Sequence, residues 1–331
     1  GGSIGSELAR QLLSGGAERL YLFDHSENAL YEIERELKLL QEEGVGERAT
    51  VVPVVGELQD ADYTRFILSR LKADVVFHAA AHKHVPMMEA NPVEAIKNNV
   101  FGTEHLVRAS KAAGVKRFVM ISTDKVVEPR SVYGVSKRIA EQVVLAENDP
   151  RHAYMVVRFG NVLGSTGSII PLFRTQILRG GPVTLTHEEA TRYFMTISEA
   201  SALVLQAGGV GRPGELYILD MGEPVRIRDL AEQMIRFYGF EPDRDIKLQV
   251  VGLRPGEKLH ERLYEPDEAL EPTEHPRLNR VATPRRLVGD LPRLLDQLRP
   301  VCFFDTGCPD SYRNRRALRA FLTAHVTTLD V

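Results

Sequence analysis

Short apolar segments alternate with amphipathic helical segments through the first half of the chain, and this alternation restricts the possible folds. Strands are predicted at residues 20–23, 51–55, 75–78, 118–122 and 153–157. Segments with helical periodicity separate them, at residues 6–13, 28–43, 63–71, 92–113 and 132–146. This spacing predicts an α/β fold with helices on both faces of a parallel sheet. Right-handed crossovers then give a doubly wound, Rossmann-type sheet.

The second half of the chain is less regular. Glycine and proline interrupt it at residues 160–182, 208–214 and 255–256. We predict a dinucleotide-binding Rossmann domain over residues 1–160 and a mainly substrate-binding region over residues 161–331. A chain of 331 residues is long enough to form both.

Composition argues against several classes of protein. The net charge of −3 gives no support for a nucleic-acid-binding surface. The two cysteines, Cys302 and Cys308, do not make a disulfide framework and fit a reducing, cytoplasmic compartment. No apolar stretch is long enough to span a bilayer. His78, His82 and His84 lack a carboxylate or cysteine at suitable spacing, so we predict no metal site.

The chain begins with Gly-Gly-Ser-Ile-Gly at residues 1–5, which has the form of the end of a glycine-rich turn. In such turns the backbone approaches a pyrophosphate at a helix N-terminus. A strand normally precedes the turn and is absent here. We therefore expect the chain to be the cytoplasmic part of a longer polypeptide, whose preceding part could carry a membrane anchor.

Asp24 strengthens the prediction of a dinucleotide site. It ends the next strand, at roughly the 20-residue spacing at which a carboxylate binds both ribose hydroxyls. A 2′-phosphate would be repelled there, which favours NAD, with NADP as the alternative cofactor. Asp24 could instead cap the following helix. The full predicted cofactor-binding set is Gly2, Ser3, Ile4, Gly5, Asp24, Glu57, Leu58, Ala79, Ala80, Tyr133 and Lys137.

The residues that indicate chemistry are Ser-Thr-Asp-Lys at 122–125, followed by Tyr133-x-x-x-Lys137. Tyr133 and Lys137 are four residues apart and share one face of a predicted helix. A hydroxyl, a carboxylic acid, two amines and a phenol therefore converge at one end of the sheet. Such a set can support hydride removal, proton removal and loss of water. Asp124 and Lys125 could alternatively form a solvated ion pair at a strand end.

The Tyr-x-x-x-Lys pair with its upstream threonine resembles the extended short-chain dehydrogenase/reductase superfamily. The Asp-Lys pair after Thr123 resembles more closely the CapD-like polysaccharide-biosynthesis family, the UDP-N-acetylglucosamine 4,6-dehydratases. Other stretches similar to that family lie at residues 1–7 (GGSIGSE), 23–27 (FDHSE), 79–86 (AAAHKHVP), 98–103 (NNVFGT), 158–164 (RFGNVLG), 192–197 (RYFMTI) and 252–258 (GLRPGEK). The resemblance implies a homo-oligomer, for which the helix at residues 132–146 is one candidate interface.

The resemblance also implies catalytic roles. Tyr133, with its pKa lowered by Lys137 and the nicotinamide charge, would take the proton from the sugar O4, to which Thr123 would hydrogen-bond. Lys125 would remove the C5 proton, and Asp124 would protonate the departing C6 hydroxyl. The product would be a UDP-4-keto-6-deoxy-N-acetylhexosamine for surface polysaccharide or glycan biosynthesis.

The resemblance implies a set of substrate contacts as well. Lys83 and Asn161 would approach the sugar and diphosphate. Arg254 would pair with the diphosphate, since a guanidinium can donate two bonds to phosphate, and Arg192 would contact the nucleotide. Arg254 could instead be a surface charge in a loop, and Arg192 could simply cover apolar surface. Asn99 resembles the structural asparagine of the superfamily.

Two other functions stay open from the sequence. A UDP-sugar 4-epimerase would share the threonine, tyrosine, lysine and NAD, but would not need Asp124 or Lys125. A non-catalytic NAD-binding regulator on the same fold would be expected to lose Tyr133 or Lys137, and both are present.

Overall fold

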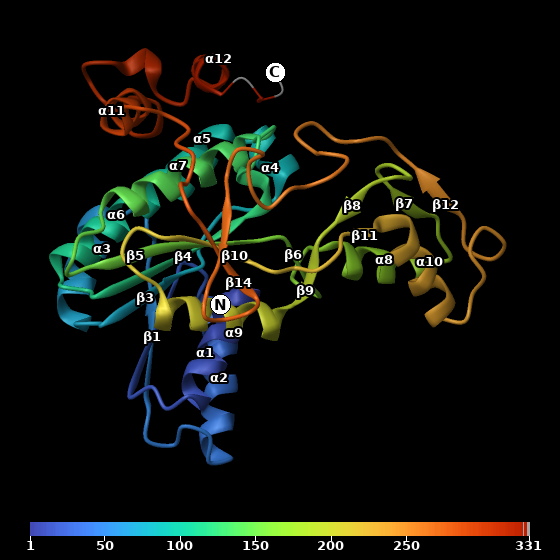
Figure 1. Cartoon of the computed structure of the whole chain (residues 1–331), viewed down its shortest axis with the longest axis horizontal. Helices are drawn as coiled ribbons and strands as arrows, with labels where there is room; N and C mark the ends of the chain where they lie inside the picture. The colour runs from blue at the N-terminus through green and yellow to red at the C-terminus, as the bar shows by residue number, and fades with distance from the viewer. Residues whose placement is uncertain (327, 330–331) are drawn as a thin grey trace.

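The computed structural model describes residues 1–326 and 328–329. At its centre is a six-stranded sheet of order β13-β14-β10-β5-β4-β3 (Figure 1). Four parallel strands form most of it: β3 (Val75–His78), β4 (Arg117–Thr123), β5 (Ala153–Phe159) and β10 (Leu216–Leu219). β14 (Leu278–Val281) and β13 (Leu270–Pro272) extend it as antiparallel strands. The predicted Rossmann-type α/β fold is confirmed.

Two further parallel strands, β1 (Arg19–Asp24) and β2 (Thr50–Val55), pair with each other in a sheet of their own. Helices α1 (Ser3–Ser14) and α2 (Glu27–Glu42) pack beside them. In the described part of the chain, the predicted parallel strands therefore fall into two hydrogen-bonded groups rather than one continuous sheet. Side chains of β1 and β3 line a common cavity between the groups.

Helices cover both faces of the central sheet. α7 (Val132–Ala146) packs against β4 and β5 from one side, and α9 (Ile197–Val210) packs against the same strands from the other. The interior strands are buried on both faces, which explains their continuous apolar sequence. The remaining helices of this part are α3 (Ala61–Leu71), α4 (Val85–Ala90), α5 (Pro92–Ile96) and α6 (Gly102–Ala112). The predicted helix 92–113 is α5 and α6, joined by a π-helical turn, η1 (Lys97–Phe101).

A smaller lobe extends from the sheet, at the right of Figure 1. Its apolar cluster includes Phe173, Ile177 and Ile235. Its elements are β6 (Asn161–Leu163), α8 (Ile169–Leu178), β7 (Val183–Leu185), β8 (Thr191–Arg192), β9 (Phe194–Thr196), β11 (Val225–Arg226), α10 (Ile227–Phe237) and β12 (Leu248–Val250). Because β10, β13 and β14 return to the central sheet, the parts on either side of residue 160 share one core. The division of labour at residue 160 stays a prediction.

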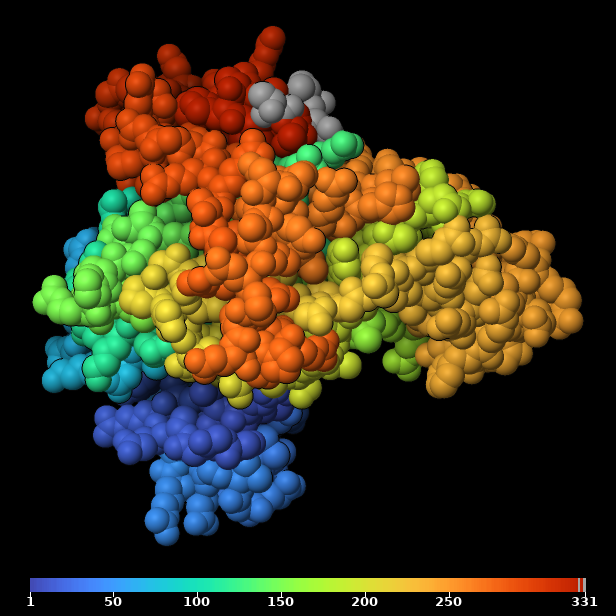
Figure 2. Space-filling model, in the orientation of Figure 1, coloured from blue at the N-terminus to red at the C-terminus, as the bar shows by residue number. Residues whose placement is uncertain are grey.

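The C-terminal tail, which we define as residues 287–326 and 328–329, forms a cap over the helical face (Figures 1 and 2). It contains α11 (Leu291–Cys302), η3 (Pro309–Ser311) and α12 (Arg315–His325). Its leucines share one apolar cluster with Ile96, Val135 and Ile139. The helix predicted as a candidate subunit interface, α7, is therefore covered by the chain's own tail, and oligomerisation stays a prediction.

None of the helices in the described residues combines the length and the apolarity needed to cross a lipid bilayer.

Candidate active site

A cavity of about 2280 Å³ opens where strands of the sheet end. It is lined by every residue of the predicted cofactor-binding set: Gly2, Ser3, Ile4, Gly5, Asp24, Glu57, Leu58, Ala79, Ala80, Tyr133 and Lys137. Of the other predicted residues, Thr123, Lys125, Lys83 and Asn161 also line it. The cavity is larger than most pockets for a single small ligand. The cavity also runs along the gap between β1 and β3 as far as Arg19 and Asp74, so its volume is not that of a single binding site.

One end of the cavity is formed by the first turn of α1. Gly2 precedes the helix, no side chain caps it, and the first turn holds no acidic residue. The backbone amides of that turn are therefore available to an anion. A Cβ atom added to Gly2 would meet nothing within 4 Å, and one added to Gly5 would lie 4.0 Å from Cβ of Ala79. Small residues thus leave this end open.

Asp24 lies beside that turn at the end of β1. Its Oδ1 accepts a hydrogen bond from the Ser26 amide at 2.9 Å. Helix α2 is capped by Ser26 instead, whose hydroxyl accepts from the Ala29 amide at 3.3 Å. The alternative prediction, that Asp24 caps the helix, is therefore wrong.

Tyr133 and Lys137 lie on the first turns of α7, which begins where the Ser131 hydroxyl accepts from the Gly134 amide at 3.1 Å. Lys137 Nζ donates to the carbonyl of Ile121 at 2.8 Å. Burial lowers the pKa of Lys137 to about 8, although Glu141 acts in the opposite direction. Burial also raises the pKa of Tyr133 to about 12, against the opposing effects of Lys125 and Thr123. The predicted lowering of the tyrosine pKa is thus not seen in the protein alone, because burial outweighs the nearby positive charge.

Asp124 and Lys125 form a pair beneath the cavity. Asp124 is completely buried, and its Oδ1 accepts from Lys125 Nζ at 2.9 Å and from the Thr123 hydroxyl at 3.0 Å. Its Oδ2 has no hydrogen-bond partner among the described residues. Burial lowers the pKa of Lys125, but the carboxylates of Asp124 and Glu261 outweigh this and raise it overall. A solvated surface pair, the alternative prediction, does not match this buried position.

Asn99 holds the loop after β3 against α7. From the π-helical turn, its Oδ1 accepts from the His82 amide at 2.9 Å, and its Nδ2 donates to the His82 carbonyl at 3.0 Å and to the Ser136 hydroxyl at 2.9 Å. π-helical turns often occur at functional sites.

His78 Nε2 lies 2.9 Å from the Thr103 hydroxyl, and burial lowers the pKa of His78 to about 3, which keeps it neutral. Among the described residues, no three His, Cys, Asp or Glu side chains are placed to share a metal ion.

The predicted substrate-binding residues divide into two groups. Asn161 accepts from Lys125 Nζ at 3.3 Å, and Lys83 Nζ donates to the Thr166 carbonyl at 3.0 Å, so both lie at the site. Burial and the charge of Lys125 lower the pKa of Lys83. The other two, Arg192 and Arg254, do not line the cavity.

The guanidinium of Arg192 donates to backbone carbonyls instead, at 2.7 Å from Thr191, 3.0 Å from Leu259 and 2.8 Å from Lys258. Arg254 lies exposed in its loop. The structure therefore brings Lys83 and Asn161, but not the two arginines, to the cavity that Lys125 and Tyr133 line. The roles of all four residues stay predictions.

A buried ionic network beneath the site was not predicted from the sequence. Ser122, next to Thr123, donates to Glu141 at 2.6 Å, and Arg158 of β5 donates to both oxygens of Glu141 at 2.8 Å. Arg158 also pairs with Glu268 at 3.0 Å. The one available signal was an arginine at the end of an otherwise apolar strand, since a buried guanidinium requires carboxylate partners.

Glu261 was also missed. Its side chain is buried, lies 3.4 Å from Lys258 Nζ, and contributes to the raised pKa of Lys125. No signal in the sequence distinguishes it from the other acidic residues of that loop.

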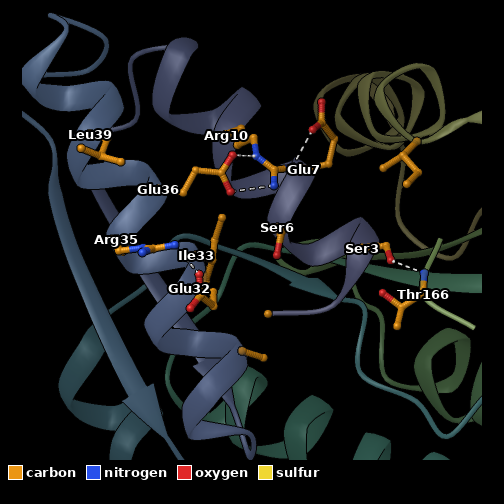
Figure 3. Close-up of a pocket in the computed structure, with 13 residues that line it drawn as sticks. Ser3, Ser6, Glu7, Arg10, Glu32, Ile33, Arg35, Glu36, Leu39 and Thr166 are labelled. Atoms are coloured by element: carbon orange, nitrogen blue, oxygen red, sulfur yellow. Dashed lines mark hydrogen bonds and ion pairs between the residues drawn. The ribbon is translucent and has the colours of Figure 1, made fainter. Parts of the chain in front are cut away.

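A second pocket, of about 640 Å³, lies between α1 and α2 (Figure 3). Its central charge, Arg10, is already paired with Glu7 at 2.9 Å and with Glu36 at 2.7 Å. This pocket therefore offers no free charge at its centre for a ligand.

Comparison with known proteins places the chain in a family. A family model described as "Polysaccharide biosynthesis protein" matches residues 1–283. The chain belongs to this family. The capsular polysaccharide biosynthesis protein CapD of Staphylococcus aureus is 50% identical over 270 residues, covering 81% of this chain and 44% of CapD. The chain thus spans less than half the length of this relative.

Two more distant relatives of this chain are named as specific enzymes. A UDP-glucose 4-epimerase of Rickettsia canadensis is 37% identical over 199 residues, covering 59% of this chain and 57% of the relative. A UDP-N-acetylglucosamine 4,6-dehydratase (inverting) of Campylobacter jejuni is 31% identical over 220 residues, covering 65% and 63%.

Solved structures agree with the fold of this family member. Pen from Bacillus thuringiensis is 31% identical, with a TM-score of 0.75 and 86% of each chain covered. The dTDP-glucose 4,6-dehydratase DesIV from Streptomyces venezuelae, solved with NAD bound, is 24% identical, with a TM-score of 0.66 and 96% of each chain covered.

Proposed function

We propose that this chain acts as an NAD-dependent nucleotide-sugar 4,6-dehydratase that converts UDP-N-acetylglucosamine to a UDP-4-keto-6-deoxy-N-acetylhexosamine, for surface polysaccharide or glycan biosynthesis. The observation that carries the proposal is the buried pair of Asp124 and Lys125 beside Thr123. Loss of water between C5 and C6 needs both a base and an acid. A 4-epimerisation needs a base for the 4-hydroxyl proton but no base at C5 and no acid at C6.

NAD is the cofactor that fits the residues around the cavity. The uncapped first turn of α1 suits a diphosphate, and Asp24 suits two ribose hydroxyls and opposes a 2′-phosphate. Gly2, Gly5 and Ala79 leave room for close approach of the dinucleotide. When bound, NAD would accept a hydride from the sugar C4 and return it to C6, so the cofactor is not consumed.

Tyr133 would remove the proton from the sugar 4-hydroxyl while Thr123 holds that oxygen by a hydrogen bond. Because burial raises the pKa of Tyr133 to about 12, nearby cations must favour the phenolate. Lys125 already acts in that direction. Lys137, with a pKa of about 8, is mostly protonated at neutral pH and would add a second positive charge from one helical turn away.

Asp124 and Lys125 would perform the elimination. A ketone at C4 acidifies the C5 proton, which Lys125 would remove as a neutral amine, while Asp124 would protonate the departing C6 hydroxyl. Both residues reach these states if one proton moves from Lys125 Nζ to Asp124 Oδ1, which are 2.9 Å apart. The ion pair and the eliminating form therefore have the same net charge and differ only in the position of that proton.

Binding of the substrate would use both sides of the predicted boundary at residue 160. Lys83 and Asn161 lie where they would contact the sugar and its diphosphate. Arg254 would reach the diphosphate, and Arg192 the nucleotide, only after their loops rearrange.

The identity of the sugar is supported by the name of the Campylobacter relative, and the role in polysaccharide synthesis by the family and by CapD. A UDP-sugar 4-epimerase is the second candidate, because the Rickettsia relative carries that name and has similar identity to this chain. The Asp124–Lys125 pair favours the dehydratase, since an epimerase has no use for it.

Mass spectrometry of UDP-N-acetylglucosamine incubated with the protein in deuterated water tests the proposal. We expect loss of one water and incorporation of one deuteron at C5. Lys125→Met should abolish both changes while NAD binding is kept, because that variant removes the base but not the cofactor site. An unchanged mass with inverted configuration at C4 would instead identify an epimerase.

A further inference from the structure

We propose that the C-terminal tail positions the catalytic helix α7, and that Arg319 and Glu89 are its positioning residues. The proposal rests on the proposed function, since Tyr133 and Lys137 lie on α7. The tail lies beyond residues 1–283, the part of the chain that matches the family model. The tail would therefore support the active site from outside the part of the chain that matches the family model.

Glu89, in α4, connects the tail to α7 with its two carboxylate oxygens. Oε2 accepts from Arg319 Nη2 of α12 at 2.7 Å, and Oε1 accepts from the amide of Val132 at 2.7 Å. Arg319 Nη2 also donates to the backbone carbonyl of Glu89 at 2.7 Å. The Glu89 side chain is only 12% exposed. Short, charge-assisted bonds in such a place are stronger than those of an ordinary surface pair.

Val132 is the first residue of α7 and directly precedes Tyr133. Its amide is one of the donors at a helix N-terminus that have no partner within the helix. A carboxylate at this point satisfies that donor and complements the helix dipole. If Arg319 is removed, the Glu89 carboxylate loses its counter-ion, and hydration then favours a rotamer that points to water. The Val132 amide would lose its acceptor, and the first turn of α7 would be held less firmly.

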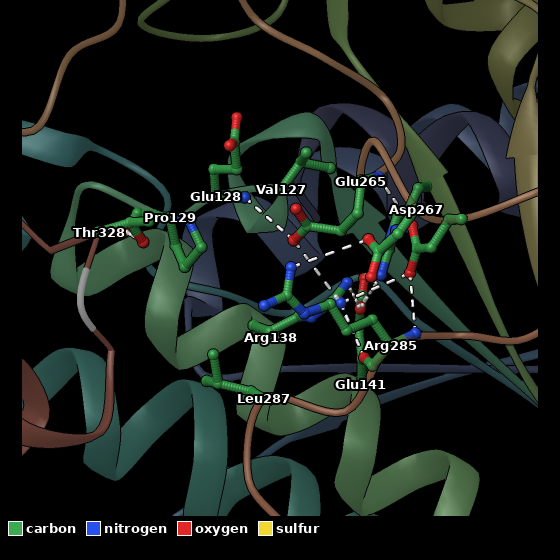
Figure 4. A network of polar contacts seen from close by, with 12 residues as sticks. Val127, Glu128, Pro129, Arg138, Glu141, Glu265, Asp267, Arg285, Leu287 and Thr328 are labelled. Atoms are coloured by element: carbon green, nitrogen blue, oxygen red, sulfur yellow. Dashed lines mark hydrogen bonds and ion pairs between the residues drawn. The ribbon is translucent and has the colours of Figure 1, made fainter.

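The loop that joins Lys125 to α7 needs such support. Glu128 in this loop has a φ of +38°, a conformation that is unfavourable for a residue with a side chain. Its amide donates to Glu265 at 3.1 Å, and the Thr328 hydroxyl of the tail donates to the Pro129 carbonyl at 2.8 Å (Figure 4). The tail therefore contacts both the strained loop and, through Glu89, the helix that follows it.

Another ion pair of the tail provides a matched control. Arg313 Nη1 donates to Glu94 of α5 at 2.6 Å, so this pair also joins the tail to the helical face. Among the described residues, Glu94 has no hydrogen bond to α7, unlike Glu89. Arg313→Gln therefore removes a tail contact of the same kind without disturbing the start of the catalytic helix.

The test compares Arg319→Gln with Arg313→Gln in the full chain. Both variants should lower the melting temperature, and Arg319→Gln should lower it somewhat more, because its pair with Glu89 is the more buried of the two. Only Arg319→Gln should lower kcat of the dehydration, by about tenfold with KM within about twofold, because misplaced catalytic groups slow chemistry more than binding. Arg319→Lys should recover most of the rate, since an ammonium can still pair with Glu89.

Amide hydrogen exchange in residues 126–137 provides a readout that does not depend on turnover. The Val132 amide should exchange faster in Arg319→Gln and remain as in the wild type in Arg313→Gln. Unchanged Val132 exchange, or equal losses of kcat in both variants, would overturn the proposal. Absence of turnover by the wild-type protein would instead refute the proposed function, and hydrogen exchange would still decide whether the tail holds α7.

Discussion

Lys137 places an amine in the interior, where its hydrogen bond goes to a backbone carbonyl and not to a carboxylate. Burial lowers the pKa of this amine from 10.5 to about 8. Between these pH values the unfolded chain holds a proton that the folded protein has lost, so the free energy of unfolding rises with pH across this window. Below pH 8 the folded protein carries the full cost of a buried charge.

Lys137→Met should therefore abolish activity yet make the protein relatively more stable at neutral pH. The stability advantage of the variant should shrink by about 2 kcal/mol between pH 7.5 and 9.5, because only the wild type gains stability there. Urea unfolding of both proteins at the two pH values measures this. A difference between them that does not change with pH would contradict the shifted pKa.

Single residues could be predicted where a regular element fixes their position. Lys125 follows a strand, and Tyr133 and Lys137 follow helical spacing, so all three reach the cavity as expected. Arg192 and Arg254 lie in irregular segments, where the direction of a side chain depends on contacts distant in the sequence. The Arg192 guanidinium donates to the backbone carbonyls of Thr191, Leu259 and Lys258. These partners cannot be deduced from the residues next to Arg192 in the sequence.

At the scale of elements, α7 approaches the catalytic loop more closely than a side chain at Gly134 would permit. A Cβ atom added there would lie 2.2 Å from the Lys125 carbonyl oxygen and 3.1 Å from Cβ of Pro129. This glycine therefore sets the distance between the element that carries Tyr133 and the loop that carries Lys125.

Gly134→Ala should force α7 away from that loop. We expect a loss of about 1–3 kcal/mol of stability, as for overpacked cores, and a large fall in kcat. Gly209→Ala in α9 is the control, because a Cβ there meets nothing within 4 Å. It should be neutral or stabilise by up to about 1 kcal/mol. Thermal unfolding and steady-state kinetics of the two variants distinguish these results.

Elements were predictable from the sequence where local pattern and burial agree. Strands β3, β4 and β5 are apolar runs of the expected length, and they form as predicted. The π-helical turn at η1 was not foreseen, because the hydrogen bonds that Asn99 makes there reach His82 and Ser136. The short strand β13 contains Glu271 and Pro272, so it lacks a strand pattern of its own and forms through pairing with β14.

At the scale of the whole molecule, the tail was the least predictable part. Its helices are amphipathic, but their apolar residues pack on α5 and α7, which lie about 200 positions earlier in the chain. No local signal identifies such a partner. The linker before the tail contains Arg285 and Arg286, two adjacent sites for trypsin.

Leu322→Glu should detach the tail, since it places a carboxylate where the leucine is 1% exposed. Trypsin should then cut the variant faster than the wild type at Arg285 or Arg286, because the chain that follows these residues is no longer held. Ala324→Glu, on an exposed position of the same helix, should behave as the wild type does. Mass spectrometry of the fragments over time gives the answer. Equal cleavage of all three proteins would show that the tail is not held by its apolar contacts.

The order of strands in the central sheet also has a consequence for the chain as it is synthesised. β5 pairs with β10, yet Phe159 and Leu216, where these strands end and begin, are 57 positions apart in the sequence. At a translation rate of roughly 5–20 residues per second, one edge of β5 has no partner strand for roughly 3–11 s after β5 is synthesised. An open edge is a site for pairing with other chains. The yield of folded protein in a cell therefore depends on the speed of translation through this interval, and not only on the stability of the finished molecule.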